Sequence, residues 1–161
     1  MTSTRLYAPR LTALGAIEQA ITSHPDIAEC AVVGIPDSLK GQLPFAFIAL
    51  QAHHHEHAAI PDDALFKDVQ KLVREQIGAI ASLGGMIQGK GMIPKTRSGK
   101  TLRRVLRELI ENAVHGDFEK EAQVPSTIED AEVVEVARKK IKEYFETKGE
   151  LHKATETRAK L

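Results

Sequence analysis

Hydrophobic and polar positions follow two different spacings along this chain. Apolar residues recur at intervals of three and four in four segments, as in amphipathic helices, at residues 13–23, 62–78, 101–114 and 130–147. Shorter apolar runs typical of strands occur at residues 27–35, at 44–50 and around 86–88. Strands that alternate with helices over short connections predict an α+β fold, with a small mixed sheet of about three strands flanked by helices.

The strand patterns also predict which faces are buried. Ala31-Val32-Val33 is a continuous apolar run, so we expect the first strand to be central in the sheet, with both faces covered. In the second strand, the alternation places Phe45 and Phe47 on one face and Ala46 on the other.

A polar insert at residues 51–61 follows the second strand and contains the run His53-His54-His55-Glu56-His57. Four histidines are enough to bind a divalent metal, but nothing around them fixes a coordination geometry or a second shell. We therefore interpret this insert as a solvated loop.

Composition excludes several classes of protein. The 161 residues suffice for one domain, and 22 basic residues balance 22 acidic ones. The single cysteine, Cys30, rules out an internal disulfide and fits a reducing compartment, so we expect a cytoplasmic protein. No apolar stretch approaches the roughly 18 residues that a membrane span needs. Arg5 and Arg10, with no acid before Glu18, leave a transit peptide as a weaker alternative.

Within this neutral chain, one segment is strongly basic. Between residues 90 and 107 there is no acidic residue, and the cations are Lys90, Lys95, Arg97, Lys100, Arg103, Arg104 and Arg107. The core of the segment, Pro94 to Arg104, joins a glycine turn to the start of a helix, where backbone N–H groups and the helix dipole favour anions. It could be a nucleotide-binding P-loop, a nucleic-acid patch, a catalytic lysine loop, or a solvated helix start without chemistry.

Two of these alternatives have little support. A P-loop needs a glycine five residues before the Gly99-Lys100-Thr101 end, but Pro94 occupies that position and cannot supply an N–H. A nucleic-acid patch usually has aromatic residues among its cations, and this segment has none. We therefore expect no nucleic-acid partner.

The run Pro94-Lys95-Thr96-Arg97-Ser98-Gly99-Lys100 resembles the terminal signature of AMP-dependent, adenylate-forming acyl-CoA synthetases, especially the acetyl-CoA and propionyl-CoA synthetase branch. Further similarity extends over about residues 15–110. It includes the segments Gly15 to Glu18, His24-Pro25 and Ala31 to Asp37. The resemblance implies that the chain is the compact C-terminal lid domain of such a ligase. It also implies that Lys100 is the adenylation lysine, with Arg97 and Gly99 as neighbours that contact the nucleotide.

The resemblance implies two further sites. Arg74 matches an arginine that contacts the 3′-phosphate of coenzyme A; otherwise it is an exposed helix residue beside Gln70 or nearby acids. A Mg²⁺ ion would be held by the main-chain carbonyls of Thr22 and Ile27 and by the side chain of His24. Without the resemblance, His24 is interpreted only as the residue that ends a helix, because it precedes Pro25 and a residue before proline avoids the α region.

Other parts of the chain depart from the family. Residues 8–14 replace the usual hinge segment, of which only Arg10-Leu11 survives. The large domain that binds ATP and the acyl group has no counterpart in these 161 residues. We divide the chain into an irregular segment, the family domain, an extension with a helix, and a frayed polar tail: residues 1–12, 13–114, 115–147 and 148–161.

The resulting prediction is the catalytic lid of a short-chain acyl-CoA synthetase. The intact ligase would convert ATP, a short carboxylate and coenzyme A into acyl-CoA, AMP and pyrophosphate. The lid would be inactive alone and would depend on a large amino-terminal domain as its partner. The alternatives are a non-enzymatic fragment that binds or regulates such a ligase, and a reading frame that begins inside a larger gene.

Overall fold

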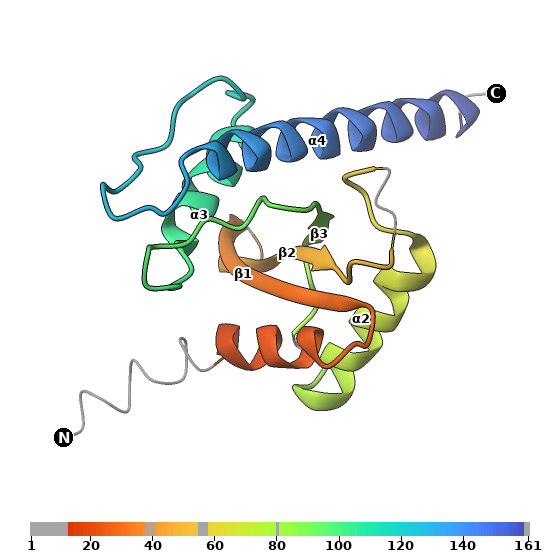
Figure 1. Ribbon diagram of the computed structural model, residues 1–161. Helices are drawn as coiled ribbons and strands as arrows, with labels where there is room; N and C mark the ends of the chain where they lie inside the picture. The colour runs from red at the N-terminus through yellow and green to blue at the C-terminus, as the bar shows by residue number, and fades with distance from the viewer. Residues whose placement is uncertain (1–12, 38, 40, 55–57, 80, 160–161) are drawn as a thin grey trace.

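The structure of the chain is a computed structural model that describes residues 13–37, 39, 41–54, 58–79 and 81–159 (Figure 1). The first element is a helical segment at residues 13–22. The labelled elements follow in the order β1 Ile27–Asp37, β2 Gly41–Leu50, α2 Asp63–Gln76, β3 Gly85–Gln88, α3 Arg103–Val114 and α4 Glu132–Ala159. The predicted α+β architecture with a mixed three-stranded sheet is therefore confirmed.

The strand order is β1-β2-β3, with β1 antiparallel and β3 parallel to β2. The prediction that the first strand is central was wrong, because β1 lies at the edge and β2 in the middle. The apolar run in β1 reflects helices on both of its faces and not a strand on both of its sides. A side chain partly satisfies the backbone groups on the free edge of β1, since Val32 donates its N–H to Glu18 Oε1 over 2.9 Å.

Helices cover both faces of the sheet, so the domain has three layers (Figure 1). On one face Ala31, Val33, Phe45 and Phe47 belong to a core shared with α3 and α4. On the other face, Val32, Ala46 and Ile48 join residues of segment 13–22 and α2 in a second core. The alternation predicted for β2 is confirmed, because its phenylalanines and its small residues lie in different cores.

Two sequence predictions need correction in the polar regions. Helix α4 continues to Ala159, so the residues after 147 are not a frayed tail as far as the structure describes them. The insert after β2 is not solvated throughout. Ala59 is buried in the core with α3 and α4, and its carbonyl accepts the N–H of Gln88 over 2.9 Å. The Gln88 side chain donates to the carbonyl of Ala58, so this part of the insert covers the free edge of β3.

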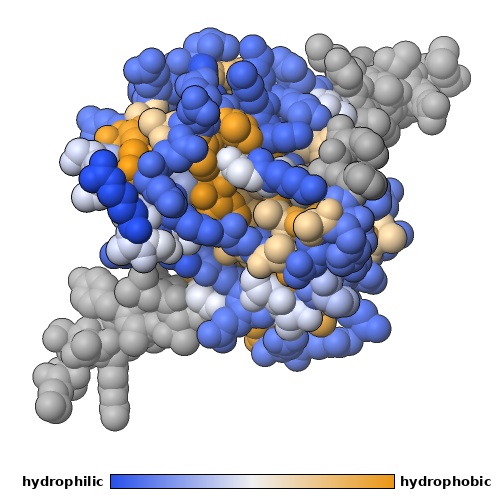
Figure 2. Space-filling view, in the orientation of Figure 1, coloured by the Kyte–Doolittle hydropathy of each residue, from blue (hydrophilic) through white to orange (hydrophobic). Residues whose placement is uncertain are grey.

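The visible surface is mostly hydrophilic, and its apolar side chains gather near the centre, below α4 (Figure 2). Even α4, the longest helix, carries charged residues throughout its length. None of the helices described here combines the length and the apolar character that crossing a membrane requires.

Candidate functional site

The basic segment forms a tight hairpin between β3 and α3. Lys95 and Thr101 pair as an antiparallel bridge at its base. Thr96 donates its N–H to the carbonyl of Lys100 over 2.8 Å, and Gly99 donates to the carbonyl of Thr96 over 2.9 Å. Gly99 has a φ of 87°, in the left-handed region that a side chain rarely adopts. Helix α3 begins at Arg103 and not at residue 101, because Thr101 is held in the bridge.

Hydroxyl groups fix the tip of this hairpin. Thr96 Oγ1 lies 2.9 Å from Ser98 Oγ and accepts the N–H of Lys100 over 3.1 Å. The hydroxyl of Thr96 thus forms hydrogen bonds with other groups of the same turn, the Ser98 hydroxyl and the backbone of Lys100. This local bonding leaves the long side chains of the turn free to point outward.

A distant segment supports the hairpin from behind. Thr96 forms a bridge with Ile128, and Arg97 donates its N–H to the carbonyl of Thr127 over 3.1 Å. Glu129 in turn donates to the carbonyl of Lys95 over 2.9 Å. The chain just before α4 thus helps to hold the lysine loop in place.

The cations of the segment fall into two groups. The first group anchors the loop to the domain: Lys95 lies 2.5 Å from Glu29 of β1, and Arg103 contacts both carboxylate oxygens of Glu18 at 2.7 and 2.6 Å. Arg104 and Arg107 likewise contact groups of the same domain, Gln123 and Glu111. Lys95, Arg103 and Arg104 thus contact other parts of the domain, whereas the Arg107–Glu111 pair lies within α3.

The second group faces solvent. Lys90, Arg97 and Lys100 are exposed, and none of them has an ion pair among the residues that the structure describes. Lys100 therefore presents an unpaired ammonium group on a loop whose backbone is fixed by hydrogen bonds. The alternative interpretation, a solvated helix start without chemistry, does not explain the hydrogen-bonded backbone or the ion pairs of Lys95 and Arg103.

Glu18 connects three parts of the domain, and sequence reasoning did not single it out. Its carboxylate accepts from Arg103 of α3 and from the backbone of Val32, while Glu18 itself lies in segment 13–22. Only 14 % of its side chain is exposed. The hydrogen bond to Glu18 raises the pKa of Arg103 above its ordinary value. Sequence spacing gives no signal for this contact, because 85 positions separate the two residues.

Cys30 lies near the charged side chains of Glu18 and Arg103, but its thiol is expected to be unreactive. Burial raises the pKa of its thiol well above the usual range, and the nearby carboxylate of Glu18 raises it further. A thiol that stays protonated is a poor nucleophile.

Arg74 lies in the last turn of α2, on the exposed face of that helix. Lys67 and Lys71 line the same open depression of about 630 Å³, together with the apolar ring of Phe66. No acid in the described part of the chain pairs with Arg74, whereas Lys71 lies 3.9 Å from Glu75. Glu75 also lines the depression, so three cations face one carboxylate and the net positive charge favours phosphate.

The three residues predicted to hold Mg²⁺ lie in one turn, but the imidazole is engaged elsewhere. His24 Nδ1 accepts the N–H of Asp26 over 3.1 Å, and Nε2 lies 3.7 Å from Asp68 Oδ2. The carbonyl of Ile27 receives a long hydrogen bond, 3.4 Å, from the side chain of Gln51. The donor set therefore fits Mg²⁺ poorly, since this hard ion prefers oxygen ligands and Nδ1 of His24 already accepts a hydrogen bond.

The structure thus separates the predicted site residues into three places. Arg97, Gly99 and Lys100 share the hairpin before α3, and Thr22, His24 and Ile27 share the turn before β1. Arg74 is on α2, which lies across the domain from that hairpin (Figure 1). The hinge pair Arg10-Leu11 lies outside the described residues.

Fold and site together define a small three-layer α+β domain whose glycine-containing hairpin presents Lys100 without an ion pair in the described structure. The family described as AMP-binding enzyme C-terminal domain matches residues 16–100, more than half of the 161 residues, and the chain belongs to this family. The resemblance carried by the lysine motif is therefore confirmed.

Two curated relatives are acyl-CoA synthetases. The chain is 38 % identical over 139 residues to 3-hydroxypropionyl-coenzyme A synthetase of Metallosphaera sedula, covering 86 % of the chain and 19 % of that enzyme. It is 41 % identical over 119 residues to acetyl-coenzyme A synthetase of Bartonella quintana, covering 74 % of the chain and 17 % of the enzyme. The chain thus spans less than a fifth of the length of these relatives.

Solved structures show the same domain. Acyl-CoA synthetase of Brucella canis superimposes with a TM-score of 0.55 at 28 % identity, over 63 % of this chain and 18 % of that one. Acetoacetyl-CoA synthetase of Streptomyces lividans gives a TM-score of 0.60, and the match covers 78 % of this chain and 17 % of the synthetase chain. At 21 % identity the second likeness supports the fold alone.

Proposed function

We propose that this domain is the catalytic lid of a short-chain acyl-CoA synthetase, which works with a large domain that binds ATP and the carboxylate. The observation that carries the proposal is the unpaired Lys100 on a hydrogen-bonded hairpin that the Lys95–Glu29 and Arg103–Glu18 ion pairs anchor to the domain. The proposed substrates of the complete ligase are ATP, a short carboxylate and coenzyme A. The cytoplasm remains the predicted compartment.

The proposed role of Lys100 is electrostatic. During acyl-adenylate formation, negative charge shifts between the attacking carboxylate and the α-phosphate. A preorganised cation stabilises that charge at little reorganisation cost, since its position is already fixed. Arg97 and Gly99 belong to the same turn, so their proposed contacts with the nucleotide would be made together with those of Lys100.

The second half-reaction would use the opposite side of the domain. Arg74 and the neighbouring lysines belong to α2, which lies across the domain from the lysine hairpin (Figure 1). We therefore propose that a rotation of the lid withdraws Lys100 and brings α2 toward coenzyme A. The predicted Mg²⁺ ligands Thr22, His24 and Ile27 remain a separate prediction, and no step proposed here depends on them.

The direct test is carboxylate-dependent ATP–pyrophosphate exchange, measured with the purified chain, with a purified large domain of an acetyl-CoA synthetase, and with both. We expect exchange above the sum of the separate components when both are present, and none from this chain alone. Exchange by the chain alone would show that it holds its own ATP site. No gain on mixing, repeated with the two domains fused, would favour a binding or regulatory fragment.

Replacing Arg74 by alanine in the fused protein should raise the KM for coenzyme A about 10–100-fold, because a charge-assisted contact with phosphate is worth about 1.5–3 kcal/mol. Exchange of pyrophosphate should be unaffected, since coenzyme A takes no part in that step. Dephospho-coenzyme A, which lacks the 3′-phosphate, provides the control. With this substrate the variant and the parent should have the same KM, and a persisting difference would place Arg74 elsewhere on the ligand.

A further inference from the structure

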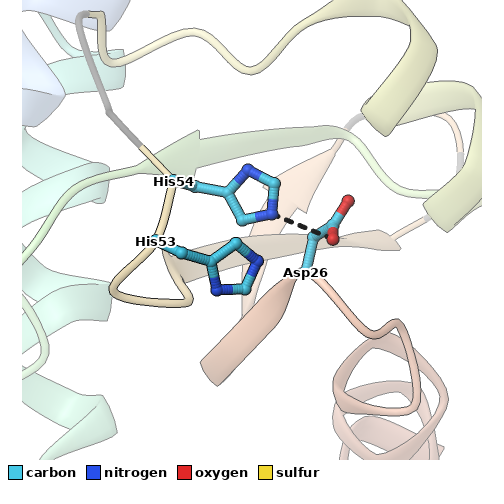
Figure 3. Close-up of side chains that lie close together, drawn as sticks. All are labelled: Asp26, His53 and His54. Atoms are coloured by element: carbon cyan, nitrogen blue, oxygen red, sulfur yellow. Dashed lines mark ion pairs between the residues drawn. The ribbon is translucent and has the colours of Figure 1, made fainter.

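We propose that Asp26, His53 and His54 form a binding site for a divalent transition-metal ion such as Zn²⁺ (Figure 3). The three side chains come from two loops at one end of the sheet. One ligand atom from each lies within 4.8 Å of the others. The interpretation of the histidine run as a plain solvated loop is therefore replaced for its first two members.

Strand pairing explains why residues so far apart in the sequence meet here. The antiparallel register pairs Ile27 with Leu50, so the residue before β1 lies beside the residue after β2. Gln51 donates its N–H to the carbonyl of Asp26 over 2.8 Å, and His54 donates to the carbonyl of Gln51 over 2.9 Å. This backbone framework positions the histidine turn over the carboxylate of Asp26.

The distances agree with those expected around a metal ion. His54 Nε2 lies 2.9 Å from Asp26 Oδ1. Zinc bonds of about 2.0–2.2 Å to nitrogen and oxygen, at angles between a right angle and tetrahedral, place the two ligand atoms about 2.8–3.5 Å apart. The rings of His53 and His54 lie with centroids 4.3 Å apart, and both point toward the carboxylate (Figure 3).

His54 is also a half-buried residue whose bonding is incomplete. Its Nε2 atom is buried yet has no aligned hydrogen-bond partner, although Asp26 Oδ1 is close. The 2.9 Å contact with Asp26 Oδ1 is an ion pair only when the imidazole carries a second proton, and a neutral imidazole can instead use this nitrogen as a metal ligand. A metal ion between the imidazole and the carboxylate would satisfy both groups at once.

The donor set points to a borderline ion and not to Mg²⁺. Two imidazoles and one carboxylate suit Zn²⁺, Ni²⁺ or Cu²⁺, whereas Mg²⁺ prefers oxygen ligands alone. Asp26 and His54 also line a cavity of about 280 Å³ that includes Asp62 and Gln88, with room for water to complete the coordination. The bound ion would join the turn before β1 to the insert after β2.

The test is calorimetric titration of the metal-free, untagged chain with ZnCl₂. We expect one Zn²⁺ per chain with a dissociation constant of about 10 μM or lower, and no competition from millimolar Mg²⁺. Asp26→Asn and His54→Gln should each weaken binding about tenfold or more. His115→Gln, which changes an exposed histidine at the end of α3, should leave the affinity unchanged.

A second variant separates this site from metal capture by the histidine run alone. The double substitution His55→Gln/His57→Gln keeps Asp26, His53 and His54, so it should retain the affinity. Loss of binding in that double variant, or full affinity in Asp26→Asn, would overturn the proposal. Far-UV circular dichroism checks that each variant folds. As an independent measure, substoichiometric Cu²⁺ should broaden the amide resonances of Asp26 and Gln51 before those of α3, and broadening elsewhere first would also contradict the site.

Discussion

Replacing Lys100 by alanine should lower carboxylate-dependent ATP–pyrophosphate exchange by about 10²–10³-fold when the chain is fused to the large domain of an acetyl-CoA synthetase. The side chain is exposed and, within the described structure, forms no ion pair, so its removal should not lower the melting temperature. The loss would therefore be a loss of transition-state stabilisation. It should reduce the turnover rate for adenylation more than the affinity for ATP.

The proposed division of labour predicts that the same variant keeps its second activity. Thioester formation from preformed acyl-adenylate and coenzyme A should fall by less than about threefold, because Lys100 has left the centre by then. Lys90→Ala is the matched control, since Lys90 is also exposed and belongs to the same basic segment. Equal losses for Lys90→Ala and Lys100→Ala would mean that net charge matters and that the hairpin position does not.

Most of the candidate loop could be predicted from sequence because its determinants are local. The hydroxyls of Thr96 and Ser98 and the positive φ of Gly99 act within one turn, so the motif contains its own geometry. Its anchors could not be predicted in the same way. The contacts of Lys95 with Glu29 and of Arg103 with Glu18 join residues that only the fold brings together. The spacing of polar residues along a helix or strand does not show which distant residue will form an ion pair with them.

The errors in the fold have a similar origin. A continuous apolar run shows that both faces of a strand are covered, but not how many strands lie beside it. Two helical layers cover β1, and Glu18 bonds to its outer edge, so an edge strand has the composition of a central one. Likewise, the metal cluster depends on the pairing of Ile27 with Leu50, and the histidine run alone contains no information about Asp26.

Gly85→Ala should destabilise the domain by about 3 kcal/mol, the upper end of the usual range for overpacking a core. A Cβ atom at this position would overlap Phe45 Cε2 and would lie 2.9 Å from Phe45 Cζ and 2.7 Å from the Tyr144 hydroxyl. Neither ring can move easily. Both are buried and meet edge to face at 5.5 Å, and the Tyr144 hydroxyl has a backbone hydrogen bond with Met86. Urea denaturation measures the expected change.

Two further substitutions determine whether this steric contact is the cause. Gly15→Ala is the control, because a Cβ there meets nothing within 4 Å and the residue lies in a helix, where alanine should stabilise by about 0.5–1 kcal/mol. Phe45→Leu removes the ring atoms that the new methyl would strike. If overlap is the cause, the loss of unfolding free energy caused by Gly85→Ala should be smaller in the Phe45→Leu background than in the parent, by at least about 1 kcal/mol. Additive effects would instead mean that the overlap with Phe45 is not the main cost and that the contact with Tyr144 or the backbone at Gly85 is responsible.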